Sequence, residues 1–221
     1  LNLWEDKRGI LLVSCFKQNP CYRKNSKFVT RHEDSRLRNV KIIFGTCNYY
    51  EDEYIWLLGK SSIIYKLDPE KSTEYDFEDA ILHMKEVNGD LIAFATTSII
   101  KFNNYIPKTI FNFEKSILGS DTKSIECNGN RILYTLERAT VLLELVGDKV
   151  KILDILPNVS GRISIDNRGR FWVCSPAHGA ICFDNPNRDL SNPKIYLPGK
   201  KTTYMFEDRQ GTFWFCTLDD G

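Results

Sequence analysis

Side chains that could bind a polar ligand stand at the ends of short apolar segments in this 221-residue sequence. Arginine, lysine and histidine can donate hydrogen bonds to a ligand, and aspartate can accept them. Two groups of such residues fall in predicted turns: Lys60, Arg138, His178, Asp219 and Asp220 in the first group, and Arg36, Arg38, Arg162, Lys200 and Lys201 in the second. The alternative interpretation for each residue is a solvated surface position.

The sequence contains no motif that indicates catalysis or metal binding. A Gly-x-Ser-x-Gly nucleophile elbow, a phosphate-binding loop and a His-Glu-x-x-His pair are absent. Only three histidines occur, and none of the seven cysteines belongs to a Cys-x-x-Cys pair, so the spacing of zinc ligands is absent too. We therefore predict no catalytic residue, no metal ion and no cofactor.

The cysteines give two further expectations. Cys174 and Cys216 occupy matching places in two apolar segments, which predicts two small buried side chains. Cys15 and Cys21 bracket the segment "FKQNP" and could form a local disulfide in an oxidising compartment, although the sequence leaves this open.

The composition is ordinary for a soluble globular protein, with 42% apolar and 27% charged residues. The net charge of +1 provides no overall field that would attract nucleic acid or an anionic membrane. No apolar run reaches the ~20 residues that a membrane helix needs. Because the chain opens on "LNLWEDKRG", inside a structured motif, we expect it to be a piece of a longer protein whose targeting segment is lost.

Apolar segments recur after a turn at intervals of about 40 residues, a period typical of β-propellers. The residues that precede these segments are Gly9, Glu53, Gly89, Gly129, Gly169 and Gly211, which are 44, 36, 40, 40 and 42 residues apart. Within the repeat from Val159 to Pro198, four short strands are predicted at "RISID", "RFWVCS", "AICFD" and "KIYLP". Four short strands in each repeat of this length favour a propeller blade.

We therefore predict an all-β fold, a single partial β-propeller domain over residues 1–221 with four-stranded blades. The expected repeats are residues 1–34, 35–79, 80–118, 119–158, 159–198 and 199–221, or about five blades and a half blade. Both ends of the chain supply the same two strands, which duplicate rather than complement one another. We accordingly expect a fragment of a larger propeller, with strand edges exposed at the open end.

Three of the repeats contain an Asp that is followed three residues later by a Gly. In two of these repeats a Trp follows the Gly. The Asp is expected to accept backbone hydrogen bonds and the Gly to adopt a positive φ, so both are predicted turn formers rather than catalytic groups. Large aromatic residues of the second strands should fill the space between blades as core, not as ligand platforms. The structural residues so predicted are Asp6, Gly9, Asp166, Gly169, Trp172, Asp208, Gly211 and Trp214, together with Trp56.

The stretches Trp4–Ser14, Ile163–Ser175 and Met205–Thr217 resemble the two-component regulator propeller repeat. That repeat has the pattern hydrophobic-x-x-Asp-x-x-Gly-x-hydrophobic-Trp-hydrophobic-small-Thr/Ser, followed by a Gly. The first copy departs from it at Leu12, and the three middle repeats keep the spacing but lose the Asp. The resemblance therefore covers six repeats in spacing and three in motif. The matching residues are Asp166, Gly169, Trp172, Ser175 and Gly179, and Asp208, Gly211, Trp214, Thr217 and Gly221.

The resemblance implies the periplasmic sensor region of a Bacteroidetes-type hybrid histidine kinase in the inner membrane. Such a region would detect a glycan or another small ligand and control transcription through a phosphorelay, with no nucleic-acid contact of its own. A homodimer is left open. The alternatives are a propeller enzyme of the lactonase or lyase type, for which Glu86 and Glu126 are the nearest carboxylates, and a scaffold for protein interaction or dimerisation.

Blade topology brings together the two groups of polar residues described first. Loops between second and third strands share one face of a propeller with the loops between blades, and concave sites form on that face. We predict ligand recognition there by Lys60, Arg138, Arg162, His178, Asp219 and Asp220.

Overall fold

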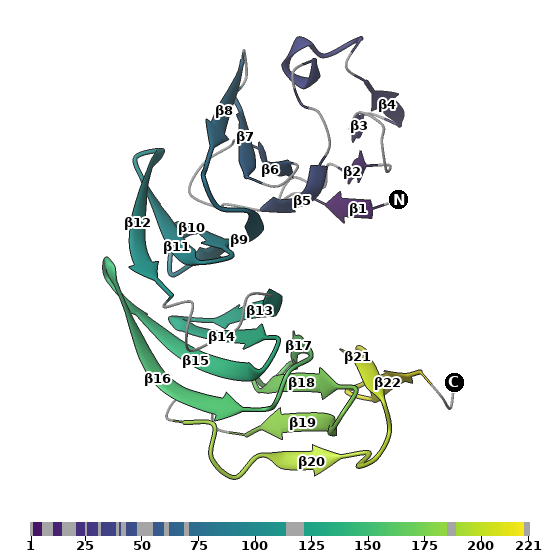
Figure 1. Ribbon diagram of the computed structural model, residues 1–221. Helices are drawn as coiled ribbons and strands as arrows, with labels where there is room; N and C mark the ends of the chain where they lie inside the picture. The colour runs from purple at the N-terminus through teal and green to yellow at the C-terminus, as the bar shows by residue number, and fades with distance from the viewer. Residues whose placement is uncertain are drawn as a thin grey trace. The chain divides into compact units, whose positions relative to one another are not determined.

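The computed structural model describes residues 2–5, 11–14, 21–24, 26–30, 32–38, 40, 43–47, 55–59, 62–68, 71–113, 122–184 and 189–218. Two compact units form, Leu1–Thr109 and Ile110–Gly221. Apart from a 3-10 turn, η1 (Ser35–Leu37), the regular elements are β-strands (Figure 1). Within this described part of the chain, none of the helical segments has the length and hydropathy that crossing a bilayer requires.

The strands of the first unit form antiparallel meanders in which neighbours in sequence pair with one another. The first sheet contains β1 (Asn2–Glu5), β2 (Leu11–Ser14), β3 (Cys21–Lys24) and β4 (Lys27–Val29). The second contains β5 (Ile43–Cys47), β6 (Ile55–Gly59), β7 (Ile63–Leu67) and β8 (Ser72–Asp76). The third contains β9 (Ile81–Val87), β10 (Asp90–Ala95), β11 (Ser98–Asn103) and β12 (Ile106–Asn112), and its last strand crosses into the second unit.

The second unit continues the same pattern. One sheet contains β13 (Thr122–Asn128), β14 (Arg131–Leu136), β15 (Ala139–Val146) and β16 (Lys149–Pro157), and the next contains β17 (Arg162–Ile165), β18 (Phe171–Ser175), β19 (Gly179–Phe183) and β20 (Lys194–Tyr196). A hairpin of β21 (Thr202–Glu207) and β22 (Phe213–Thr217) follows. The predicted all-β fold of four-stranded antiparallel sheets is confirmed, and each sheet falls within one of the expected repeat ranges.

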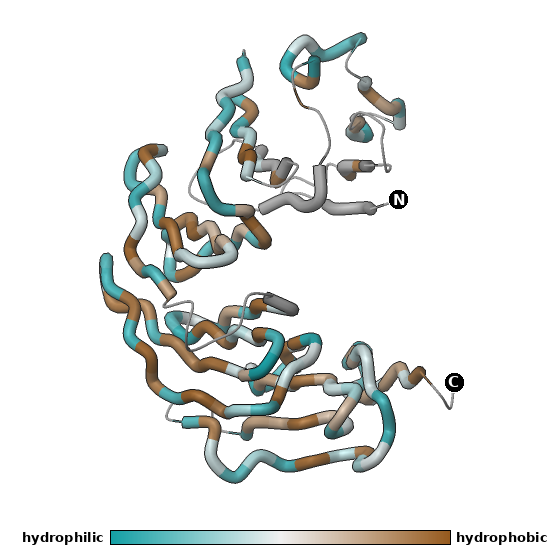
Figure 2. The backbone as a smooth tube through the Cα atoms, viewed as in Figure 1, coloured by the Kyte–Doolittle hydropathy of each residue, from teal (hydrophilic) through white to brown (hydrophobic). Residues whose placement is uncertain are grey.

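In the three sheets formed by β9–β12, β13–β16 and β17–β20, the two middle strands are the most deeply buried, as their unbroken apolar runs predict. All five residues of β18 and all five of β19 are buried, whereas the three residues of the outer strand β20 are exposed. Figure 2 shows hydrophilic residues at turns such as that between β15 and β16. Both faces of a sheet therefore need a cover, and neighbouring sheets supply it.

Tryptophans of the second strands lie between successive sheets where such a neighbour exists. Trp56 is fully buried, and its ring centroid lies 5.2 Å from that of Phe102 in the following sheet. Trp172 is 2% exposed and packs against Phe213 and Phe215 of β22, at centroid distances of 5.1 and 5.7 Å. These contacts are the inter-sheet packing that the sequence predicted for the two residues.

The expectation that Trp214 also belongs to the core is wrong for this structure, because its side chain is 60% exposed. Trp214 occupies the place in its hairpin that Trp172 occupies in the preceding sheet. No described element follows β22 to cover the ring. Burial of this residue depends on a neighbour, which the local sequence pattern does not reveal.

The Asp-x-x-Gly turn is organised around the carboxylate of Asp166. Its Oδ1 accepts backbone N–H bonds from Arg168 at 3.0 Å and Arg170 at 2.9 Å, and Gly169 has the expected positive φ of 76°. Its Oδ2 accepts the Arg170 Nε at 2.6 Å and the Trp172 indole at 2.8 Å. Burial alone would raise the pKa of Asp166, but these bonds outweigh it and lower the pKa. The carboxylate thus fixes both the turn and the tryptophan.

The second copy of this turn has the same geometry in a more exposed setting. The Asp208 carboxylate accepts the backbone N–H groups of Gln210 and Thr212 and the indole N–H of Trp214, the last at 2.8 Å. Gly211 has a φ of 82°. The first copy, with Asp6 and Gly9, lies outside the described residues.

Hydrogen bonds between residues about one repeat apart join successive sheets of the second unit. The Asn128 amide donates to the Gly169 carbonyl at 2.8 Å, and the Asn167 N–H donates to the Glu207 carboxylate at 2.6 Å. At the first strands, the Ser124 hydroxyl accepts the N–H of the next sheet's Ile163 at 3.1 Å. Neighbouring sheets are therefore held in a defined register as well as packed.

In the first unit, a buried ion pair joins the first and second sheets. The Arg36 guanidinium binds both oxygens of Asp34 and donates to the carbonyl of Asp68 at 2.9 Å. The hydroxyl of Tyr22, in β3, donates to the same Asp34 carboxylate at 2.8 Å. Because its guanidinium is engaged in this way, Arg36 is a structural residue here rather than a ligand-binding one.

Replacing Asp166 with Ala should lower the free energy of unfolding of the second unit by about 3 kcal/mol. The substitution removes the acceptor of the buried Trp172 indole N–H and of the Arg170 Nε, and Arg170 keeps only its bond to the more exposed Asp184. Chemical denaturation followed by tryptophan fluorescence measures the loss. Asp208→Ala is the matched control, since it removes the corresponding backbone and indole bonds at an exposed turn that has Thr212 in place of Arg170, and it should cost less. Equal losses for the two variants would contradict this account.

The Asp34–Arg36 pair should make the first unit sensitive to acid. Arg36 lowers the pKa of Asp34 from 3.8 to about 2, a shift worth about 2 kcal/mol. Because the folded pKa is the lower one, this stability is present above about pH 4 and is lost as the pH falls towards 2. Denaturation between pH 5 and pH 2 should therefore show a steeper loss for the wild type than for Asp34→Asn. The exposed variant Glu78→Gln should follow the wild type, and identical slopes for Asp34→Asn and the wild type would refute the assignment.

Candidate functional site

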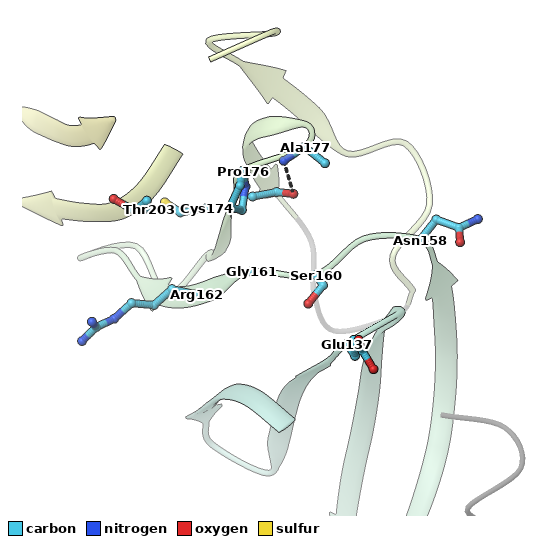
Figure 3. A pocket seen from close by; sticks show the side chains of 10 residues that line it. Glu137, Asn158, Ser160, Gly161, Arg162, Cys174, Pro176, Ala177 and Thr203 are labelled. Atoms are coloured by element: carbon cyan, nitrogen blue, oxygen red, sulfur yellow. Dashed lines mark hydrogen bonds between the residues drawn. The ribbon is translucent and has the colours of Figure 1, made fainter. Parts of the chain in front are cut away.

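A pocket of about 480 Å³ opens in the second unit where loops from successive sheets meet (Figure 3). The turn between β14 and β15, the linker between β16 and β17, the turn between β18 and β19, and the start of β21 all contribute to it. The lining residues are Glu137, Asn158, Ser160, Gly161, Arg162, Cys174, Ser175, Pro176, Ala177 and Thr203. These are the two kinds of loop that blade topology places on one face.

Only some of the predicted ligand-binding residues lie at this pocket. Arg162 lines it, whereas Arg138 and His178 each directly follow a lining residue. Lys60, Asp219 and Asp220 lie outside the described residues. The remaining candidates of the second group do not line the pocket: Arg38, Lys200 and Lys201 are exposed, and Arg36 is bound to Asp34.

Buried hydroxyl groups fix the main chain of the pocket wall. Thr135 donates to the carbonyl of Gly161 at 2.6 Å, and Thr140 donates to the carbonyl of Val159 at 2.9 Å. On the next sheet, Thr202 donates to the Ser175 carbonyl at 3.3 Å. All three threonines are fully buried. A shift of the linker would therefore break the buried hydrogen bonds that Thr135 and Thr140 donate to it, which is unfavourable.

Gly161 is required at its position because of a close approach rather than an unusual dihedral angle. A Cβ atom there would lie 2.1 Å from the carbonyl oxygen of Cys174 and 3.0 Å from the Cα of Ser175. Any other residue would push the linker between β16 and β17 away from β18. The shape of the pocket thus depends on glycine, which has no side chain, at position 161.

Asn158 begins this linker in a left-handed conformation, with a φ of 60°. Its N–H donates to the Arg138 carbonyl at 2.7 Å, and its own carbonyl lies 2.9 Å from His178 Nε2. In the neutral tautomer protonated at Nε2, or in the imidazolium form, this ring nitrogen donates to the carbonyl. Two residues predicted to bind ligand therefore also position the pocket wall.

The polar side chains that remain are the groups available to a ligand. Within the described part of the chain, Glu137 and Ser160 make no side-chain hydrogen bond, and Arg162 forms no ion pair. The Arg162 guanidinium instead lies over the ring of Tyr204, with its Cζ 4.6 Å from the centroid. Tyr204 is 38% exposed, so an aromatic surface adjoins the pocket through Arg162.

The pocket's cysteine is buried and a poor nucleophile. Cys174 is 1% exposed, as predicted, and burial, assisted by the nearby Cys216, raises the pKa of its thiol to about 12. A thiol of this pKa is not deprotonated near neutral pH and is a poor nucleophile. The parallel expectation for Cys216 is wrong, because this residue is exposed on the same uncovered face as Trp214. Cys15 lies outside the described residues, so the possible Cys15–Cys21 disulfide stays an expectation from the sequence.

Sequence reasoning missed most of the polar residues that line the pocket. It selected charged residues in the correct loops but passed over their neighbours Glu137, Asn158 and Ser160 and the strand residue Thr203. For Glu137, its position next to Arg138 was the available signal. Glu86 and Glu126, the carboxylates considered for an enzyme, lie in β9 and β13 and do not line the pocket. Among the residues that the structure describes, no cluster of His, Cys, Asp or Glu could hold a metal ion.

No protein-family model matches the sequence. No curated protein matches it either. Solved structures do match the fold. One is the extracellular domain assigned to the hybrid two-component system BT3049 of B. thetaiotaomicron, which is 15% identical with a TM-score of 0.65 over 96% of this chain and 31% of its own length.

Two further structures illustrate the range of proteins with this fold. The extracellular domain assigned to the one-component system BT4673 of B. thetaiotaomicron is 11% identical, with a TM-score of 0.60 over 98% of this chain and 37% of its own length. The WD40 domain of Neurospora crassa Pan2 is 10% identical, with a TM-score of 0.63 over 91% of this chain and 66% of its own length. This chain therefore spans about a third of each bacterial domain. At these identities the likeness shows the fold, which is that of a β-propeller.

Proposed function

We propose that this chain is the ligand-sensing propeller of a two-component sensor protein and that it acts outside the cytoplasm. The pocket of the second unit would bind a small polar molecule, such as an oligosaccharide, and the parent protein would carry the signal across the membrane to control transcription. In this proposal the parent is a hybrid sensor histidine kinase of the inner membrane, with its propeller in the periplasm. In this proposal the chain itself contacts no nucleic acid.

The observation that carries the proposal is the contrast between the wall of the pocket and its lining. The main chain of the wall is held by Thr135, Thr140 and His178, whereas the side chains of Glu137 and Ser160 have no partner among the described residues. A rigid backbone that presents unengaged polar side chains is suited to selective binding. Planar hydrogen-bonding groups beside an aromatic ring suit a saccharide in particular, since its hydroxyls and its C–H face need both.

Three further observations support sensing over catalysis. The cysteine in the pocket has its pKa raised to about 12, which disfavours a covalent mechanism through that thiol. The carboxylates considered for a lactonase or lyase do not line the pocket. Two solved structures with this fold are extracellular domains assigned to bacterial signalling systems. Their likeness to this chain supports the kind of protein proposed, and the pocket supports the kind of ligand.

Arg162→Ala should weaken binding of an acidic or neutral oligosaccharide at least about tenfold, because it removes a polar side chain that lines the pocket and the guanidinium that covers the Tyr204 ring. A panel of oligosaccharides screened by thermal shift, followed by isothermal titration calorimetry of the hits, measures this change. Product analysis by mass spectrometry in the same samples tests the enzyme alternative.

The matched control is Arg168→Ala, an exposed arginine in the turn at the other end of the same sheet, which should bind as the wild type does. If no oligosaccharide binds, or if both arginine variants lose affinity equally, the pocket is not the saccharide site. Turnover of a bound saccharide or lactone would replace the sensing proposal with the enzyme alternative.

Gly161→Ala should abolish ligand binding while leaving most of the fold intact. The added Cβ meets the Cys174 carbonyl, and the resulting displacement should cost about 1–3 kcal/mol of stability. Calorimetry and thermal unfolding measure the two effects separately. Gly147→Asn is the control, because Gly147 has open space around it and a φ of 60° that asparagine tolerates. Unchanged binding by Gly161→Ala would show that the ligand lies elsewhere.

A further inference from the structure

The lining of the pocket in the second unit contains two charged side chains, Glu137 and Arg162. The Arg162 guanidinium is already engaged, because its Cζ lies 4.6 Å from the centroid of the Tyr204 ring. Figure 3 shows the Arg162 side chain extending away from Ser160 and Glu137. Among the described lining residues, Glu137 is therefore the charged group that has no partner of its own.

Two other basic residues near the pocket do not neutralise the Glu137 carboxylate. Arg138 is the next residue of the same turn, but it is exposed and forms no ion pair with Glu137 in the part of the chain that the structure describes. The ring nitrogen Nε2 of His178 lies 2.9 Å from the carbonyl oxygen of Asn158, so this side chain is used to hold the pocket wall. An unpaired negative charge therefore borders the space open to a ligand.

An ionised carboxylate can accept hydrogen bonds but cannot donate them. Its two oxygens can accept from two adjacent hydroxyl groups of one sugar ring, and hydrogen bonds to a charged acceptor are stronger than those between neutral groups. The Ser160 hydroxyl, on the linker between β16 and β17, can donate or accept a further bond, while Gly161, Pro176 and Ala177 add apolar surface. A carboxylate or sulfate of a ligand placed beside Glu137 would instead be repelled.

We propose that Glu137 makes this pocket selective for neutral saccharides over acidic ones. Its carboxylate accepts hydrogen bonds from adjacent hydroxyls of a neutral sugar and disfavours a sugar that carries a carboxylate or sulfate at the same place. Selectivity then has an attractive and a repulsive component, and both come from one side chain. This inference rests on the saccharide-binding function proposed above for the same pocket.

Isothermal titration calorimetry of the full chain with matched pairs of trisaccharides tests this proposal. Each pair consists of a neutral glucose-, galactose- or mannose-based trisaccharide and the same trisaccharide with its C6 hydroxymethyl groups oxidised to carboxylates. The wild type should bind the neutral member of at least one pair, and it should bind the oxidised member at least about tenfold more weakly.

Glu137→Gln keeps the size of the side chain but removes its charge and one of its two acceptor oxygens. It should weaken binding of the neutral trisaccharide at least about tenfold and bring the affinities for the two members of the pair to within about threefold of each other. Because Glu137 is exposed in a turn, the fold should persist, which thermal unfolding can verify. Arg138→Gln is the matched control, since it removes the neighbouring charge of the same turn, and it should bind the neutral trisaccharide as the wild type does.

The outcomes separate this inference from the proposed function. If the wild type binds oxidised trisaccharides as tightly as neutral ones or more tightly, or if Glu137→Gln keeps the wild-type preference, the selectivity inference is wrong while the saccharide site stands. Equal losses of neutral affinity in Arg138→Gln and Glu137→Gln would also overturn it, because the effect would not then come from the Glu137 carboxylate. If no member of any pair binds, the proposed function itself is wrong.

Discussion

The Asp166 carboxylate links the local chemistry of a turn to the packing of whole sheets. Its two oxygens bind the backbone of the turn, the Arg170 side chain and the indole of Trp172. A ring held at its nitrogen presents its faces in a fixed orientation to the next sheet. The aromatic contacts of Phe213 and Phe215 depend on that orientation. One buried charge therefore determines how a hairpin turns and where its largest side chain points.

Inter-sheet packing in turn produces the candidate site. Bonds such as Asn128 to Gly169 hold the sheets together at the turns between first and second strands, and buried threonine hydroxyls hold the linker beside the pocket. The backbone acceptors of the wall are thereby engaged, whereas Glu137 and Ser160 are left unengaged among the described residues. The pocket therefore results from the way in which successive blades are joined. Its specificity resides in the few side chains that take no part in the hydrogen bonds between blades.

Local patterns predicted the features of the fold that arise from local causes. Alternating and continuous apolar runs gave the strands, the spacing of about 40 residues gave the sheets, and the Asp-x-x-Gly spacing gave the turns at Asp166 and Asp208. Features that depend on a neighbouring strand or sheet could not be predicted from such local patterns. The exposure of Trp214 reflects what lies over it, and the need for glycine at position 161 comes from a carbonyl on another strand. The loops of the site could be predicted, but the engagement of Arg36 and the stacking of Arg162 on Tyr204 depend on side-chain placement.

The hydrogen bonds that span about one repeat have an evolutionary consequence. Asn128 binds Gly169, and Asn167 binds Glu207, so the groups that join two modules reside partly in each of them. Tandem duplication of a whole module copies both halves of such a junction at once, and the array can lengthen without new chemistry. A module moved to a different neighbour would lose one half of its junction at each border. The sequences of adjacent modules should therefore diverge together. The order of the modules along the chain should be inherited with them.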